Sequence, residues 1–199
     1  TVDIAKGDDA TVRLLQQAAE AGGYSVVVPP VEFRITVMHG GGTTTLDRFH
    51  AFVEREIPLP AGAGSDAVTT AIVLNRDGST RHVPTAMERR DGKYYAIVSS
   101  MTNSMYALVQ GKRSFIDMDG HWAEHTVRDM ASRMIVNGEG SRFRPEDAIT
   151  RAEFAAILVR ALGLGEKEPT VNFADVSAGD WYAGVITQAV EYGIVSGYA

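Results

Sequence analysis

The last third of the chain repeats itself at a fixed spacing, and this feature constrains the fold more than any other. Trp122 and Trp181 stand 59 positions apart in a chain of 199 residues. The same offset relates Val127 to Ile186, Ile135 to Ile194, Val136 to Val195, and Gly138 to Gly197. A repeat of this kind is one supersecondary unit, and a unit buries its apolar face only by stacking on a neighbour. We therefore expect packed copies of one small unit here.

Helix signals divide each copy into parts. The first copy predicts a helix over residues 123–134, because its apolar residues recur on one helical face, and Asn137-Gly138 is the predicted stop. A second helix begins at Thr150, whose pairing with Glu153 is typical of a capping box, and ends at Gly163. The second copy reaches Ala199 just after its first helix. The chain thus holds about one and a half copies.

The shortened second copy needs a neighbour for its apolar residues. These residues are Val185, Ile186, Val190 and Ile194. Because a repeat unit cannot bury such a face alone, we expect them to pack on the helices of the first copy or on a second chain. Self-association through the incomplete second repeat is therefore one possible partnership.

The first half of the chain follows the pattern of strands. Residues 8–23 predict one short capped helix, after which apolar and polar residues alternate over 31–37, the period of a half-buried strand. Further strands are predicted at 49–57, 68–74, 80–83, 94–98 and 105–109, and Gly40–Gly42 as a hairpin tip. The predicted fold class is α+β. A β-rich domain over residues 1–112, an antiparallel sheet or sandwich, precedes an all-α helix-loop-helix region with repeats at 113–170 and 171–199.

The repeated motifs resemble a known family. Its features here are Phe115-Ile116-Asp117, Trp122-Ala123, Ile135-Val136-Asn137-Gly138, Phe143-Arg144-Pro145 and Ile149-Thr150-Arg151-Ala152-Glu153. This series is similar to the S-layer homology repeat of bacterial surface proteins. The resemblance implies a helix-loop-helix unit, usually present in three copies that form a pseudo-threefold spindle. It also implies a non-catalytic, extracellular role at the cell wall, in which the repeats bind a secondary cell-wall polysaccharide that often carries pyruvate ketals.

Arg151 is the first candidate for binding that polymer. It lies in the first turn of a predicted helix, where the helix dipole favours negative charge, so stability alone does not call for a cation there. An arginine beside exposed helix N–H groups suits a carboxylate such as a pyruvate ketal, and Arg142 and Arg144 add positive charge. The alternative is that Arg151 pairs at the surface with Glu153, Glu146 or Asp147.

The remaining candidates are matched between the two copies. Trp122 and Trp181 could stack on a sugar face, but an aromatic residue that begins a repeat helix is more often buried, and we expect a core position with one exposed edge. Asp117 could cap the following helix or accept hydrogen bonds across the repeat interface. Gly138 and Gly197 most simply allow a left-handed helix exit. The resemblance places these turns beside the ligand groove, where Asn137 and Ser196 would bind sugar hydroxyls.

Composition excludes several other partners. Residues 1–111 hold 10 basic and 12 acidic residues, and residues 112–199 hold 9 and 13, so neither half offers the basic surface that nucleic acid requires. The sequence has no apolar run long enough for a membrane span and no cysteine for a thiolate metal site or a cysteine nucleophile. We therefore expect no nucleic acid, membrane, metal or cofactor as a partner.

One motif favours an enzyme instead. His121-Trp122-Ala123-Glu124-His125 matches the H-x-x-E-H pattern of zinc peptidases, in which two histidines on a helix hold the metal and a glutamate acts as base. The second copy has Asp180-Trp181-Tyr182-Ala183-Gly184 at these positions, so the repeat itself does not need the metal residues. Glu191 is the nearby helical candidate for a third ligand. A zinc-dependent peptidase and a purely structural linker remain the alternatives.

Residues 24–110 resemble, more weakly, the stretch before wall-binding repeats in some large Gram-positive surface proteins. This resemblance is carried by Asp77-Gly78, His82-Val83-Pro84-Thr85, Asp91–Ala96 and Thr102-Asn103-Ser104. It suggests a spacer that positions the repeats. A carbohydrate-binding sheet that uses Tyr94, Tyr95 or Tyr106 is the functional alternative, although such tyrosines are more often cross-strand packing pairs.

Overall fold

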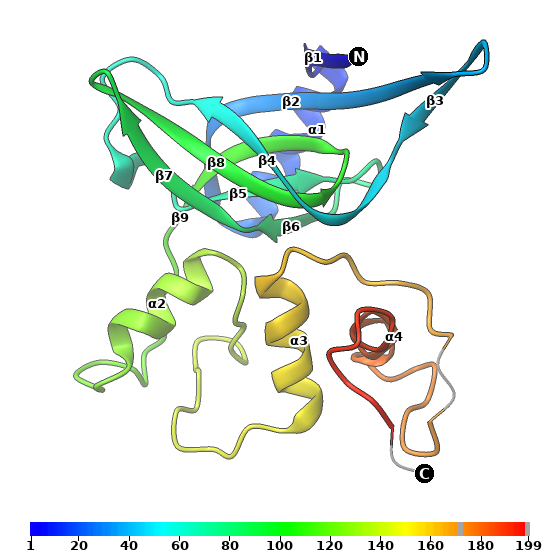
Figure 1. The fold of residues 1–199 in the computed structure, drawn as a ribbon. Helices are drawn as coiled ribbons and strands as arrows, with labels where there is room; N and C mark the ends of the chain where they lie inside the picture. Colours follow the sequence, from blue (N-terminus) through cyan, green and yellow to red (C-terminus); the bar gives the residue numbers. More distant parts are fainter. Residues whose placement is uncertain (171–172, 198–199) are drawn as a thin grey trace.

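The structure is a computed structural model that describes residues 1–170 and 173–197. Figure 1 shows two parts, the β region (residues 1–111) and the helical region (residues 114–197), joined by one connection after the last strand. The fold is α+β, as predicted. In chain order the elements are β1 (Val2–Lys6), α1 (Asp9–Gly22), β2 (Tyr24–His39), β3 (Gly42–Leu46), β4 (Arg48–Pro58), β5 (Thr70–Leu74), β6 (Thr80–Val83), β7 (Thr85–Arg90), β8 (Lys93–Thr102), β9 (Met105–Gly111), α2 (Glu124–Ser132), α3 (Arg151–Ala161) and α4 (Ala183–Glu191).

Two antiparallel sheets build the β region. One has the strand order β1-β2-β9-β5-β6, with β3 added to β2, and the other has the order β4-β8-β7. Each predicted segment matches a strand of these sheets, although β5 begins at Thr70, two residues after the predicted start at residue 68, and Gly40–Gly42 forms the tip of the β2–β3 hairpin, as predicted. Three strands, β1, β3 and β7, were not predicted. They lie at sheet edges, are at most six residues long and expose most of their residues, so burial imposes little pattern on their sequences.

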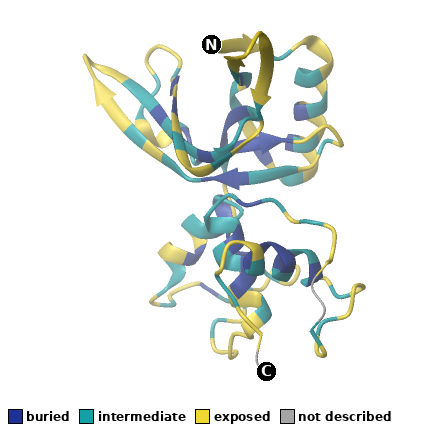
Figure 2. Cartoon of the chain, turned by 45° about the vertical axis from the view of Figure 1, so that its right-hand side comes forward, coloured by how far each residue is buried: buried dark blue, intermediate teal, exposed yellow. Residues whose placement is uncertain are grey.

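The strand β5 is buried on both of its faces. Ala71 and Val73 point into the core between the two sheets, whereas Ile72 and Leu74 point into the core under α1. A strand covered on both faces has no polar side, which explains the uninterrupted apolar run of this segment. In Figure 2 the buried residues accordingly lie within the sheets. Figure 1 shows the β2–β3 hairpin extending beyond them, and the residues at its tip are exposed.

A buried arginine joins the two sheets at one corner. Arg55 on β4 donates to the Thr102 carbonyl oxygen at 2.8 Å and to Asn103 Oδ1 at 2.9 Å, at the turn between β8 and β9. Its guanidinium also lies near the rings of Phe33 and Tyr106, at 5.9 and 5.2 Å from the ring centroids. The Thr102-Asn103-Ser104 segment therefore has a structural role as the acceptor site for this arginine.

The helical region is not all-helical. Helices α2, α3 and α4 lie there, but long loops separate them, and Glu139 pairs with Arg142 in an isolated antiparallel bridge. The capping box of α3 is confirmed, because Thr150 accepts from the Glu153 N–H and the Glu153 side chain accepts from the Thr150 N–H. Among the residues that the structure describes, no helix is long and apolar enough to cross a membrane.

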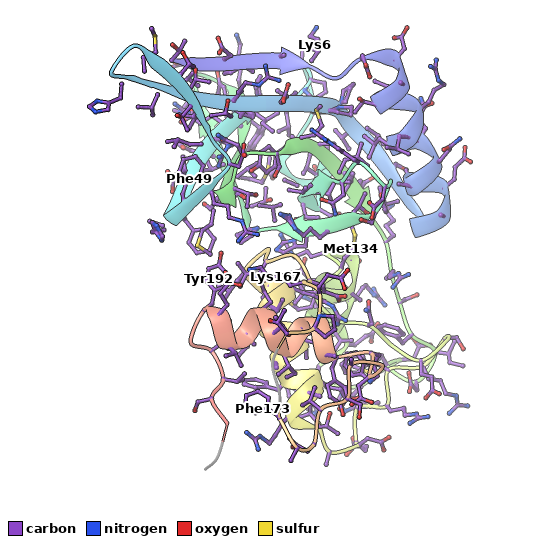
Figure 3. All side chains as sticks on the ribbon, turned by 90° about the vertical axis from the view of Figure 1, so that its right-hand side faces the viewer. Lys6, Phe49, Met134, Lys167, Phe173 and Tyr192 are labelled. Atoms are coloured by element: carbon purple, nitrogen blue, oxygen red, sulfur yellow. The ribbon has the colours of Figure 1, made fainter. Side chains whose placement is uncertain are left out.

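Close backbone packing fixes the helical region against the β region. A Cβ added at Gly111, the last residue of β9, would lie 2.5 Å from the Ser132 carbonyl oxygen at the end of α2. A Cβ at Gly163, just after α3, would lie 2.8 Å from Pro84. Met134 also packs on the core beneath α1, and Figure 3 places it at the level where the two regions meet. The ends of α2 and α3 thus contact β6 and β9 directly.

This junction buries a neutral histidine. His82 on β6 is buried, its Nδ1 lies 2.7 Å from Thr70 Oγ1, and burial followed by the nearby Arg133 charge lowers its pKa from 6.5 to about 4. The unfolded chain therefore binds a proton near pH 6.5 that the folded chain does not bind until about pH 4. The stabilisation is complete above the unfolded pKa and is lost as the pH falls toward the folded pKa.

We predict that acid weakens the fold through His82. Between pH 7.5 and pH 4.5 the wild type should lose about 3 kcal/mol more stability than the His82→Gln variant, which has no titrating ring. Urea unfolding of both proteins at the two pH values measures this difference, and the variant serves as the control for the carboxylates that also titrate. Equal pH dependence of the two proteins would contradict the assignment.

Candidate functional site

The first repeat unit is closed by a loop that folds back onto its start. The Asp117 carboxylate accepts hydrogen bonds from the N–H groups of Phe143 and Arg144, each at 2.9 Å. These donors, Phe143 first, hold the pKa of Asp117 below its usual value. The rings of Phe115 and Phe143 pack 5.5 Å apart beneath this contact. We had expected Asp117 to cap the following helix or to accept hydrogen bonds across the repeat interface. It instead binds the backbone of a loop within its own unit.

Gly138 and Gly197 have a different role from the predicted one. Neither has a positive φ angle, and α2 ends at Ser132, well before the predicted stop. A Cβ at Gly138 would lie 2.3 Å from a ring carbon of Phe115, and one at Gly197 would lie 2.4 Å from the same ring carbon of Phe173. The prediction of a left-handed exit at these glycines was wrong. Each glycine instead allows an aromatic ring from the start of its unit to pack against the backbone.

The left-handed exit lies four residues earlier in both units. Met134 has φ of 64° and Gly193 has φ of 68°, and they stand 59 positions apart. After each of them the chain makes the same contact, because the Ile135 N–H donates to the Met130 carbonyl at 2.9 Å and Ile194 donates to Ala189 at 2.8 Å. The two copies found in the sequence thus make the same backbone hydrogen bond at equivalent positions.

The N-terminus of α3 gathers charged groups. Arg151 is the first residue of this helix and is exposed. Arg144, in the loop before it, pairs with Glu139 and lies 3.7 Å from Asp147. The hydrogen bonds from Thr150 lower the pKa of Glu153, and the charge of Arg144 adds to this effect. The hydrogen bond from the Arg144 N–H to Asp117 fixes the backbone of Arg144. The structure therefore brings Arg144 to the same helix end as Arg151, with carboxylates that offset part of its charge.

Both tryptophans are exposed, which corrects the expectation of a core position. Trp122 is 91% exposed beside the His121 ring, and Trp181 is 57% exposed with its ring edge-on to Tyr182. The reason is that each indole precedes the first turn of its helix, since α2 begins at Glu124 and α4 at Ala183. The buried face of each helix starts later. Each unit thus presents an indole to solvent at the same position.

The second unit packs on the first, as predicted. Val185 on α4 is fully buried with Ala156 and Val159 of α3, and Ile186 and Ile194 pack against the same cluster, whereas Val190 is only half-buried and lies outside it. Ser196, the counterpart of Asn137, is exposed as Asn137 is. The predicted second repeat also includes residues 171–172 and 198–199, which lie outside the described residues.

Comparison with known proteins agrees with this geometry. The sequence profile of the S-layer homology domain matches residues 114–155 and 172–199, the two units just described. The chain is an S-layer homology domain-containing surface protein. It is extracellular, at the cell surface.

The relatives share only a short part of their length with this chain. An amylopullulanase of Thermoanaerobacterium thermosulfurigenes is 37% identical over 95 residues, which are 47% of this chain and 5% of the relative. An S-layer-related protein of Niallia circulans is 44% identical over 57 residues, 28% of this chain and 4% of the relative. A cellulosome-anchoring protein of Acetivibrio thermocellus is 31% identical over 83 residues, 41% of this chain and 19% of the relative. No solved structure matches the chain significantly.

The geometry gives the zinc-site alternative no support. An H-x-x-E-H site needs both histidines on one helix, but His121 precedes α2 and only His125 lies on it. The Nε2 atom of His121 lies 3.2 Å from Glu146, and Glu124 pairs with Arg128. Within residues 1–170 and 173–197, no three His, Asp or Glu side chains are grouped to hold a metal ion.

The tyrosines of the β region do not form one exposed sugar-binding face. Tyr106 is fully buried between the sheets, which removes it from any such surface. Tyr94 and Tyr95 are half-buried, and each lies under an arginine, with Arg89 at 5.7 Å and Arg90 at 4.5 Å from the ring centroids. These contacts are the packing pairs that tyrosines in a hairpin most often make.

Sequence reasoning missed the rings that shape each unit. Phe115 was named only as part of a motif and Phe173 was given no role, although each packs on the glycine that follows the first helix of its unit. A signal was present in the sequence, because the phenylalanine and the glycine recur together in both copies. Close packing of a ring on a backbone is, however, a property of the folded chain that spacing alone does not predict.

We predict that Gly138→Ala destabilises the first S-layer homology unit by about 1–3 kcal/mol, because the added methyl overlaps both the Phe115 ring and the Arg142 carbonyl oxygen. Urea unfolding measures the change. Gly179→Ala is the matched control, since a Cβ there meets no heavy atom within 4 Å and its φ is not positive. Equal stability of the two variants would show that the packing is not needed.

Proposed function

We propose that this chain attaches its parent protein to the cell wall by binding a secondary cell-wall polysaccharide, without catalysis of its own. The observation that carries the proposal is the exposed indole at the same position of both units, Trp122 and Trp181. Exposed aromatic surface repeated in this way is typical of a binding surface rather than of packing. The relatives include two carbohydrate-degrading enzymes, an S-layer-related protein and a cellulosome-anchoring protein, and the enzymes match only at the S-layer homology region. Proteins of such different kinds share an attachment module more readily than a reaction.

The polymer chemistry that suits this surface is a sugar chain with carboxylate groups. A sugar ring stacks on indole through its apolar face, and Asn137 and Ser196 are exposed and can bind hydroxyl groups. At the start of α3, Arg151 and the first-turn N–H groups favour an anion such as a pyruvate ketal. Arg144 adds positive charge there. Asp117, Gly138 and Gly197 shape the loops and would act through them.

The proposed roles of the three parts of the chain follow the change from strands to helices. Residues 1–112 would serve as a spacer domain, residues 113–170 as the first S-layer homology repeat, and residues 171–199 as a shortened second repeat. Support comes from the chain itself, since the strands end at Gly111 and the profile matches begin at residue 114. The first repeat holds the Thr-Arg-Ala-Glu element, so it would hold the anion.

We predict that Arg151→Ala weakens binding to a pyruvylated wall polymer about tenfold or more, because a charge-assisted contact is lost. Co-sedimentation of the purified chain with the polymer, before and after chemical removal of pyruvate, measures the effect. Arg76→Ala, at an exposed arginine in the β5–β6 turn, is the matched control and should bind as the wild type does. Unchanged affinity of the Arg151 variant would remove this residue from the site.

We also predict that the polymer shields the indoles. In the free chain, acrylamide should quench the fluorescence of both tryptophans, and Trp122 more strongly because it is the more exposed. Added polymer should reduce the quenching, and the variants Trp122→Phe and Trp181→Phe assign the protection to each unit. If the polymer binds and neither indole becomes less accessible, stacking on the indoles is not part of binding.

A further inference from the structure

A second polar site lies at the opposite end of α3, where the two regions meet. A cavity of about 110 Å³ lies between β8, the segment after α3, and the end of α4. Arg81, Thr102, Lys167, Gln188 and Tyr192 are among the residues that line it. Figure 3 shows Lys167 and Tyr192 on the side of α4 that faces the β region. The cavity is therefore lined by residues of both regions and is separate from the N-terminus of α3.

Arg81 carries a positive charge into this cavity without compensation. Its Nη1 atom is buried and has no hydrogen-bond partner, and Nη2 makes one long contact of 3.4 Å with Thr102 Oγ1. Of the residues that the structure describes, none places a carboxylate within 4 Å of this guanidinium. Burial lowers the pKa of Arg81 from its ordinary value. A buried cation normally has an ionic or hydrogen-bonding partner, because its desolvation is otherwise costly.

Gln188 presents a second unpaired group to the same cavity. This α4 residue is only 5% exposed, and its Oε1 atom is buried without a hydrogen-bond partner. An amide can turn either its oxygen or its NH₂ group toward a ligand, so it can donate as well as accept. Two side chains that line this cavity, one from each region, thus each hold a buried polar atom without a partner, although such atoms are generally satisfied in folded proteins.

The local charge favours a monovalent anion. Arg48 and Lys167 also line the cavity, but both pair with Glu191, at 3.7 Å for Arg48. The exposed Glu166 is the acidic residue in the lining. The lining therefore has three cations and two nearby carboxylates, an excess of one positive charge. A guanidinium matches the planar oxygen pair of a carboxylate better than it matches other monovalent anions.

We propose that this cavity binds a small monocarboxylate, of the size of acetate or pyruvate, between Arg81 and Gln188. The ligand accepts hydrogen bonds from Arg81 Nη1 and from the Gln188 amide, and so joins β6 to α4. Because only the docked arrangement brings the two side chains together, the anion stabilises the contact between the β region and the second S-layer homology unit. This inference does not depend on polysaccharide binding at Arg151.

Thermal unfolding tests the proposal. At pH 7.5 and constant ionic strength, replacing sodium chloride by sodium acetate should raise the Tm of the chain saturably, by about 5 °C. Arg81→Gln and Gln188→Leu should each abolish most of the rise. Arg76→Gln is the matched control for Arg81 and should retain it. Arg151→Ala should also retain it, which separates this cavity from the end of α3.

A direct measurement covers the case in which Arg81→Gln does not fold. Saturation-transfer NMR of acetate with the wild type should detect binding, and Gln188→Leu should reduce the signal at least fivefold. Three results would overturn the proposal. They are no acetate signal with the wild type, an unchanged signal with Gln188→Leu, and the same Tm in sodium acetate as in sodium chloride.

Discussion

The helical region depends on one buried face of α3. Ala155, Ala156 and Val159 on this face are almost completely buried, and Val185 and Ala189 of α4 pack against them. On its other side, α3 contributes Ile157 and Ala161 to the core of the first unit. Small side chains allow neighbouring backbones to approach closely, so one short helix can serve two partners. Neither α2 nor α4 could bury its apolar residues alone, and both units therefore exist as folded structures because α3 lies between them.

The two ends of α3 lie in different surroundings. Its C-terminal end meets the β region, where Gly163 packs against Pro84 and the buried His82 lies nearby. Its capped N-terminal end points away from the β region and into solvent, as Figure 1 shows. The free N–H groups and the positive end of the helix dipole therefore lie where a large polymer can reach them. The β region fixes that orientation through its contacts at Gly111 and Gly163. Under the proposed function, it would assist binding in this way without contacting the ligand.

The sequence predicted those features best that depend on residues close together in the chain. The capping box at Thr150 and the period of the strands follow from neighbouring residues, so they could be predicted. The exposure of Trp122 could not be predicted in this way. It depends on α2 beginning at Glu124, two residues after Trp122, and an aromatic residue at a helix start is otherwise expected to be buried. The role of Gly138 depends on a ring 23 positions earlier in the chain, and no local pattern indicates that approach. The edge strand β3 has no buried face, so its sequence does not alternate between apolar and polar residues.

The two units share their hydrogen bonds but not their surroundings. His125 on α2 is exposed, and its counterpart on α4 is Gly184, where a Cβ would lie 2.5 Å from the Lys167 carbonyl oxygen. The linker after α3 therefore crosses α4 closely, whereas the same face of α2 is open. This difference explains why the second unit has no counterpart of His125, since a side chain at Gly184 would overlap the linker. Sequence identity between repeats is thus limited by what each copy must pack against, whereas Gly138 and Gly197 stay the same because each packs against an aromatic ring of its own unit.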